Sequence, residues 1–163
     1  MVSGFSFVNG VMNPPIRAIL RSPLRFLLDG NLISLTYTGR RSGHRFSLVT
    51  MYAQFDNELI VVVGQPEKKN WWRNFREKAL ADVRFKGRKC TCAAQLLEKD
   101  PSNVVPRLEA YCCKHPSTAR LYGFRKGSDG KFNSEDIAKA SERSVMVVFE
   151  LPSREAPPAE GTN

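Results

Sequence analysis

Two glycines bracket a basic segment in the stretch LTYTGRRSGHRFSLV. Gly39 and Gly43 allow positive φ angles and a close approach of the main chain to a ligand. Between them, Arg40 and Arg41 supply forked cationic donors that suit phosphate, and Ser42 adds a hydroxyl donor. Successive amides in such a turn can point into one concavity that binds an anion. The segment therefore indicates an anion-binding turn between two strands, with a solvated basic hairpin tip as the alternative.

A second basic loop has the sequence GQPEKKNWWRNF. Lys68 and Lys69 place positive charge just before an expected short helix, whose start itself attracts anions. Trp71, Asn74 and Phe75 share one face of that helix, so Phe75 is expected to anchor it on the rest of the domain. The polar Asn74 on the same face requires a hydrogen-bond partner, for which the backbone is a candidate.

Four cysteines occur in two close pairs, Cys90-Thr-Cys92 and Cys112-Cys113. The first pair falls on one face of an expected strand, which is typical of buried free thiols. The second pair lies near His115 and raises the question of a metal site. The sequence has no C-x-x-C pair and no second histidine at ligand spacing, so no metal site is expected.

The elements that would position these loops are mainly strands. Strands are expected at residues 32–38, 45–54, 58–64, 81–86, 88–98 and 144–151. Helices are expected at residues 14–29, 71–79 and 101–114. The helix between strands is too short for the crossover of a parallel unit. We therefore expect an α+β domain over residues 1–151, a barrel of about six mainly antiparallel strands with flanking helices. The proline-rich residues 152–163 are expected to be a disordered tail.

The composition points to an anionic partner. The 163 residues carry a formal net charge of +9, which suits nucleic acid, an acidic membrane or a phosphorylated small molecule. No apolar run reaches the roughly 18 residues that span a bilayer, and the N-terminus lacks a signal-peptide pattern, so a cytoplasmic location is expected. Nucleic acid is the least favoured partner because no helix-turn-helix, zinc-finger or strand-aromatic signature is present.

The order of the motifs resembles the deazaflavin-dependent nitroreductase family. The resemblance rests on LTYTGRRSG, a strand ending in VVVG, the segment PEKKNWWRNF and the hairpin after it, over about residues 32–97. It implies the split β-barrel fold of the flavin-mononucleotide-binding proteins. It also implies coenzyme F-420, a deazaflavin with a phosphodiester and a polyglutamate tail, with flavin mononucleotide as the alternative cofactor.

The resemblance carries over to individual positions. Arg41, Ser42 and Gly43 match the family's residues that hold the phosphate, with Arg40 beside them. The strand end Val62, Val63 and Gly64 matches backbone that lines the deazaflavin ring. Trp71 matches the family's tryptophan near the cofactor, and Asn74 matches the asparagine that follows it. The family's usual arginine after the second glycine is Phe46 here, preceded by Arg45. The common lysine of the second loop is Glu67, so Lys68 or Lys69 would serve instead.

The implied activity is hydride transfer from reduced F-420 to a nitroaromatic, a quinone or an activated alkene. Tyr122 could orient that acceptor or supply a proton, with a packing tyrosine as the alternative. Residues 123–140 look inserted relative to the family. A non-catalytic protein that binds a deazaflavin, flavin, haem or fatty acid on the same barrel is the competing function.

The expected N-terminal helix combines arginines with an apolar stripe. Such a helix could lie on an acidic surface, as a peripheral contact with the inner membrane face, or pack on the barrel or on a second subunit. Split barrels of this type commonly pair, but a monomer is also known in the family, so a homodimer and a monomer are both left open.

Overall fold

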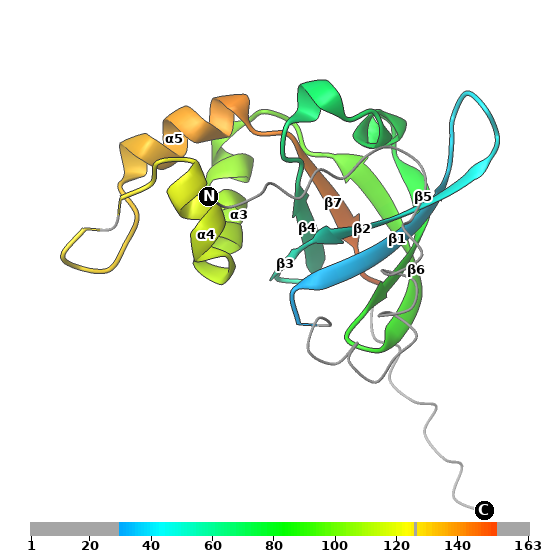
Figure 1. Cartoon of the computed structure of the whole chain (residues 1–163), viewed down its shortest axis with the longest axis horizontal. Helices are drawn as coiled ribbons and strands as arrows, with labels where there is room; N and C mark the ends of the chain where they lie inside the picture. Colours follow the sequence, from blue (N-terminus) through cyan, green and yellow to red (C-terminus); the bar gives the residue numbers. More distant parts are fainter. Residues whose placement is uncertain (1–29, 126, 153–163) are drawn as a thin grey trace, which may run out of the picture.

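A curled, fully antiparallel sheet forms the body of the molecule in the computed structural model, which describes residues 30–125 and 127–152 (Figure 1). The strand order is β2-β1-β5-β6-β7-β4-β3. The strands are β1 (Leu32–Thr38), β2 (Arg45–Met51), β3 (Ala53–Phe55), β4 (Glu58–Val62), β5 (Ala79–Phe85), β6 (Arg88–Leu96) and β7 (Met146–Glu150). This is the split-barrel architecture that the sequence predicts.

The first and last strands of that order, β2 and β3, are consecutive in the chain and are separated only by Tyr52. The expected single strand at residues 45–54 is therefore present but divided, because it pairs with β1 before Tyr52 and with β4 after it. Tyr52 is fully buried, and its ring packs edge-on against Phe85 with centroids 5.9 Å apart. The bend at this residue makes the sheet wrap round and raises the strand count from six to seven.

The pairing register places both basic loops at the same end of the sheet. Thr38 pairs with Arg45 across the first loop, and β5 begins beside the end of β1. On the other side of the sheet, Val62 at the end of β4 pairs with Met146 at the start of β7. The end of β6 lies beside the start of β7 on one side and beside the start of β5 on the other. The start of β7 and the start of β5 are therefore at the same end of the sheet. The second loop, which follows Val62, therefore lies at the same end as the first.

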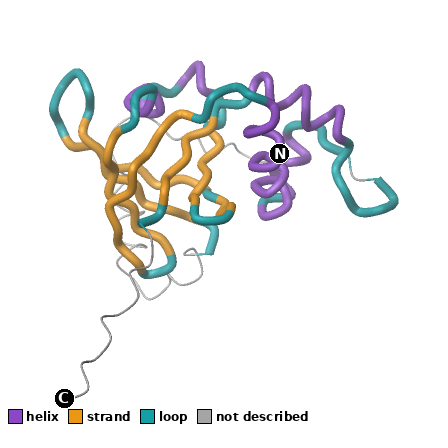
Figure 2. Tube along the Cα trace, turned by 180° about the vertical axis from the view of Figure 1, so that it is seen from behind, coloured by secondary structure: helices purple, strands orange, loops and turns teal. Residues whose placement is uncertain are grey.

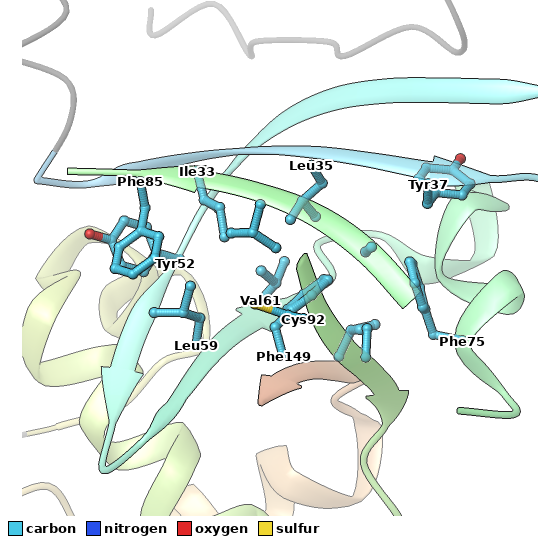
Figure 3. Packing of buried hydrophobic residues seen from close by; sticks show 14 of the residues in the cluster. Ile33, Leu35, Tyr37, Tyr52, Leu59, Val61, Phe75, Phe85, Cys92 and Phe149 are labelled. Carbon is cyan, nitrogen blue, oxygen red and sulfur yellow. The ribbon is translucent and has the colours of Figure 1, made fainter. Parts of the chain in front are cut away.

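Two hydrophobic clusters sandwich part of the sheet. The inner cluster fills the curl of the barrel, where Leu35, Leu59 and Phe149 point toward one another (Figure 3). The outer cluster lies between the sheet and the helices, and includes Ile60 and Val62. Strand β4 thus alternates between two buried environments, which explains why its sequence is an almost uninterrupted apolar run.

The helices gather on one side of the barrel (Figure 2). They are α3 (Pro101–Lys114), α4 (Pro116–Leu121) and α5 (Ser134–Arg143), with α3 packed on β3, β4 and α5. The expected helix at residues 101–114 is confirmed, and its start is capped by Asp100, whose side chain accepts from the Ser102 amide. The expected helix at residues 71–79 is instead a short 3-10 helix, η2 (Trp71–Phe75), preceded by η1 (Pro66–Lys68). It stops early because the chain enters β5 already at Ala79.

Two expectations fall outside the described residues: the helix at residues 14–29 and the tail, of which only Pro152 is described. Within residues 30–125 and 127–152, no helix has both the length and the apolar character that a membrane span requires.

His115 joins α3 to α4 in a buried position. Its Nε2 atom lies 2.7 Å from the Tyr52 carbonyl oxygen, and its ring packs on Tyr111. Burial lowers the pKa of His115 below its ordinary value of 6.5, partly opposed by the Tyr52 bond. The folded protein therefore holds this ring neutral, with Nε2 donating to the carbonyl.

Stability should consequently fall as the pH drops below about 6.5. Just below pH 6.5, His115 binds a proton in the unfolded chain but not in the folded protein, so protonation favours unfolding. This loss of stability ends once the pH is below the lowered pKa of His115 in the folded protein. We expect His115→Gln to weaken this pH dependence in urea unfolding between pH 7.5 and 5.5, while His44→Gln, at an exposed site, leaves it intact. Equal slopes for parent and His115→Gln would contradict the prediction.

Candidate functional site

The loop joining β1 to β2 is closed by its own backbone. The Gly39 amide donates to the His44 carbonyl and the Gly43 amide donates to the Gly39 carbonyl, each over 2.8 Å. The Ser42 hydroxyl accepts from the His44 amide at 3.3 Å. The amides of Arg41 and Ser42 have no hydrogen-bond acceptor among the described residues. Two neighbouring donors therefore remain for a ligand.

The two glycines of this loop serve different purposes. Gly43 adopts a φ of +67°, which side-chain-bearing residues rarely tolerate. Gly39 is required for space, since a Cβ there would lie 2.6 Å from Cε2 of Phe46 and 2.8 Å from Oγ of Ser42. Phe46, which replaces the family's usual arginine, stacks on Tyr37 with centroids 5.7 Å apart. The loop is thus shaped by close contact as well as by backbone freedom.

The three arginines of the first loop and its edge differ in their partners. Arg40 pairs with Glu77 at 3.0 Å, and Arg45 pairs with Asp82 at 2.6 Å. Arg41 is exposed and forms no ion pair with any described residue. Of these three arginines, Arg41 is therefore the one whose charge is not compensated by a carboxylate of the described residues.

The second loop brings an ammonium group to the end of β4. A Cβ built on Gly64 would lie 3.9 Å from the Nζ atom of Lys69, so this side chain reaches back over the glycine. Burial lowers the pKa of Lys69, an effect that the nearby Glu67 carboxylate partly offsets. Lys68 is exposed by comparison. The structure therefore brings together the two predicted positions Gly64 and Lys69.

Aromatic residues fix the second loop to the barrel. Phe75 is fully buried, as expected for an anchor, and Trp71 packs edge-on against it with centroids 6.1 Å apart. The indole Nε1 of Trp72 donates to the Pro66 carbonyl over 3.1 Å, which ties η2 to η1. Trp71 is half-buried, so only part of its ring surface is used in packing.

Asn74 connects the two loops. Its Oδ1 atom accepts from the Arg40 amide at 2.9 Å, and its Nδ2 atom donates to the Trp71 carbonyl at 2.9 Å. The expectation that this polar side chain would find a backbone partner is confirmed at both of its ends. Neither Asn74 nor Glu77 is among the cofactor-binding residues expected from the sequence, although each contacts Arg40.

The end of β4 contributes main chain rather than side chains. The Val62 side chain is buried among the helices and the Val63 side chain in the barrel core, so neither is directed to solvent. The Val63 amide donates to the Val145 carbonyl over 2.8 Å. Gly64, which follows, is exposed.

Tyr122 lies away from the first loop, although its side chain forms a hydrogen bond with the Ser144 side chain, near the strand end where the second loop begins. It ends α4, stacks on Phe124 with centroids 5.6 Å apart and packs on the outer cluster. The first loop and α4 lie at opposite ends of the molecule in both overall views (Figures 1 and 2). Burial raises the pKa of Tyr122, so its hydroxyl is held protonated.

The cysteines are free thiols, and among the described residues no three potential metal ligands come together. The Sγ atoms of Cys90 and Cys92 lie 3.5 Å apart, which confirms that they share one face of β6. Burial raises the pKa of Cys92 to about 12, so this thiol is a poor nucleophile. Cys112 is buried and Cys113 exposed.

Comparison with known proteins identifies the family. The model of the F420H(2)-dependent quinone reductase family matches residues 23–112, more than half of the 163-residue chain. The chain belongs to this family. The matched segment includes both loops described above. Membership of the F420H(2)-dependent quinone reductase family indicates coenzyme F-420 as the cofactor and an F-420-dependent reductase activity. No curated protein shows significant similarity to the chain.

Solved structures support the fold at low sequence identity. One described as an F420-H2 dependent reductase, FDR-A, aligns with a TM-score of 0.52 and 15% identity, covering 74% of this chain and 94% of its own. A second, described as a domain-swapped dimer, aligns with a TM-score of 0.52 and 14% identity over 83% of this chain and 99% of its own. Both likenesses bear on the split-barrel fold alone.

The residues at the loop end of the barrel fit the coenzyme of the F420H(2)-dependent quinone reductase family. A phosphodiester requires hydrogen-bond donors and positive charge, and the two unpartnered amides beside the exposed Arg41 guanidinium supply both. The Lys69 ammonium over Gly64 adds a second positive charge, at the end of β4. No acidic side chain among the described residues compensates either cation by an ion pair.

Proposed function

We propose that the protein transfers a hydride from reduced F-420 to an electron-poor small molecule, with a quinone as the first candidate acceptor. The observation that carries this proposal is the family match over residues 23–112, which contains both basic loops. The fold supports it independently, because the sheet register brings these loops to one end of the barrel. Nitroaromatics and activated alkenes are the other acceptors that the same chemistry admits.

In this proposal the first loop holds the tail of the coenzyme. Arg41 contributes a guanidinium, Ser42 a hydroxyl and an amide, and Gly43 the backbone turn that lets the amides face the phosphate. Arg40 and Arg45 border this position but are engaged with carboxylates. Lys68 and Lys69, the two lysines of the second loop, would receive the carboxylates of the tail.

The ring would lie against the end of β4. There the exposed Gly64 allows a flat group to approach the main chain. Val62 and Val63 would contact the ring through their backbone atoms, because their side chains are buried in the two clusters. The half-buried Trp71 would border the ring from η2. When bound, the coenzyme supplies the hydride, so the protein contributes positioning and electrostatics. Tyr122 lies with the helices, and the proposal gives it no role.

Turnover of reduced F-420 tests the proposal. The purified protein is mixed with reduced F-420 and either a quinone, a nitroaromatic or an enone, and the return of the oxidised deazaflavin absorbance is followed. We expect acceptor-dependent oxidation, fastest with the quinone, and tighter binding of F-420 than of flavin mononucleotide in parallel titrations. Binding of F-420 without oxidation by any acceptor would favour the non-catalytic alternative. Failure to bind F-420 would overturn the proposal.

A further inference from the structure

Arg40 connects the first loop to Asn74 of η2 and to Glu77, which lies between η2 and β5. Its amide donates to Oδ1 of Asn74 at 2.9 Å, and its guanidinium donates to Oε1 of Glu77 at 3.0 Å. Both bonds are exposed, but the second joins two flexible charged side chains, with that of Glu77 82% accessible, and such pairs contribute little. The amide contact is therefore the stronger of the two connections.

Asn74 is itself held at a fixed position relative to the core. Its Nδ2 atom donates to the Trp71 carbonyl, which sets the orientation of the amide plane. The next residue, Phe75, is fully buried and contacts the rings of Tyr37 and Phe149. A continuous set of contacts thus runs from the barrel core through Phe75 and Asn74 to the backbone of Arg40.

This arrangement separates the two adjacent arginines. The amide of Arg40 is bound to Asn74 and its guanidinium to Glu77, whereas Arg41 has an exposed guanidinium without an ion pair and an amide without an acceptor among the described residues. Binding to Asn74 orients the peptide group before Arg40, and the loop continues from that fixed point to the amides of Arg41 and Ser42.

We propose that Asn74 is a positioning residue that holds the first loop in its anion-binding conformation, so that Arg41 binds the phosphodiester while Arg40 serves as the attachment point. This inference rests on the proposed function for its ligand, but the loop geometry on which it depends can be measured without one. A preformed loop avoids the cost of ordering the backbone on binding. Asn74 therefore acts on coenzyme affinity without touching the coenzyme.

The experiment compares substitutions of Asn74 in the full chain. In Asn74→Ala, the Arg40 amide should exchange with solvent about threefold to tenfold faster, as expected for loss of one hydrogen bond. The Kd and KM for F-420 should rise by about fivefold, with kcat unchanged, because ground-state and transition-state binding are affected equally. Asn74→Asp keeps an oxygen acceptor for the Arg40 amide but loses the bond to the Trp71 carbonyl and adds a negative charge beside the loop. Arg40 exchange should therefore stay closer to that of the parent than in Asn74→Ala, whereas F-420 affinity should not recover.

A matched control is available in Asn57, whose Nδ2 atom donates to the Leu151 carbonyl at 2.7 Å in the turn between β3 and β4. Asn57→Ala removes a comparable bond and should change neither Arg40 exchange nor F-420 affinity. If Asn74→Ala does not fold, Asn74→Gln replaces it, since one added methylene displaces the acceptor while keeping the amide.

The outcomes separate the inference from the function on which it rests. Unchanged Arg40 exchange in Asn74→Ala would overturn the positioning role. Faster exchange with unchanged F-420 affinity, while Arg41→Ala still weakens binding, would overturn it too but leave the proposed function standing. Unchanged affinity in both variants would show that the first loop does not bind the coenzyme and would overturn the inference, whereas failure of the parent protein to bind F-420 would overturn the proposed function itself.

Discussion

Arg41→Ala is expected to weaken F-420 binding by about 10- to 100-fold, which corresponds to the loss of charge-assisted hydrogen bonds to a phosphate. The free energy of unfolding should change by less than about 0.5 kcal/mol, because the side chain is exposed and has no ion pair among the described residues. Fluorescence titration with F-420 measures the first effect and urea unfolding the second. Added salt should also lower the F-420 affinity of the parent protein, and it should lower that of Arg41→Ala to a smaller extent.

A matched control is Arg84→Ala. Arg84 is an exposed cation of β5 that pairs with Ser34, at the end of the sheet away from the first loop. Its removal lowers the net charge by the same amount but should leave F-420 affinity unchanged. Equal losses in both variants would mean that overall charge, rather than the first loop, attracts the coenzyme. Equal F-420 affinity of Arg41→Ala and the parent would show that the first loop is not part of the binding site.

Phe75→Ala should have the largest effect on folding, lowering the free energy of unfolding by about 3–5 kcal/mol. The Phe75 side chain is fully buried and its ring lies 5.5 Å from that of Tyr37, 5.7 Å from Phe149 and 6.1 Å from Trp71, centroid to centroid. Removing it leaves a cavity among three aromatic rings and releases η2 from the barrel. Urea unfolding followed by tryptophan fluorescence measures the loss.

Phe75→Leu provides the comparison, since it retains most of the buried volume and should cost about 1.5 kcal/mol or less. A cost below about 1 kcal/mol for Phe75→Ala would show that the site collapses around the missing ring, against the packing described here. Because the anchor also carries Asn74, any folded Phe75→Ala protein should bind F-420 more weakly than Phe75→Leu.

Elements with local signals were predictable. The bounds of β1 agree with the expectation because Ile33, Leu35 and Tyr37 alternate with residues that face outward, a period of two that defines a half-buried strand. The start of α3 follows from Asp100 and the proline after it. Both signals depend only on neighbouring residues, which is why they could be read from the sequence.

The helices α4 and α5 were missed, and one of them had a usable signal. Glycines and charged residues interrupt the hydrophobic pattern between α4 and α5, so the region reads as an insertion. Yet Asn133 caps α5 by accepting from the amides of Glu135 and Asp136, a start signal that is visible in the sequence. The face that α5 buries holds only one large apolar residue, Ile137, beside Ala140 and Ser141, so the segment lacks the run of bulky apolar positions by which the other elements were recognised.

In the candidate site, the sequence predicts which residue types the two loops contain, but not which carboxylate pairs with which arginine. Glycine, arginine and serine types indicate anion binding whatever their partners. Which arginine is left without a carboxylate depends on Glu77 and Asp82, which lie far along the chain from Arg40 and Arg45. Only the folded sheet brings these groups together, so the distinction between Arg40 and Arg41 could not have been made beforehand.

The position of β7 between β6 and β4 has a consequence for biosynthesis. The ribosome completes β4 at Val62, but the strand that joins it to β6 begins only at Met146. Until β7 is made, no strand can link β6 to β4, and the edge of β4 that β7 covers in the finished fold lacks its neighbour. Unpaired apolar strand edges template aggregation. A nonsense codon that removes β7 should therefore yield insoluble polypeptide rather than a smaller working barrel.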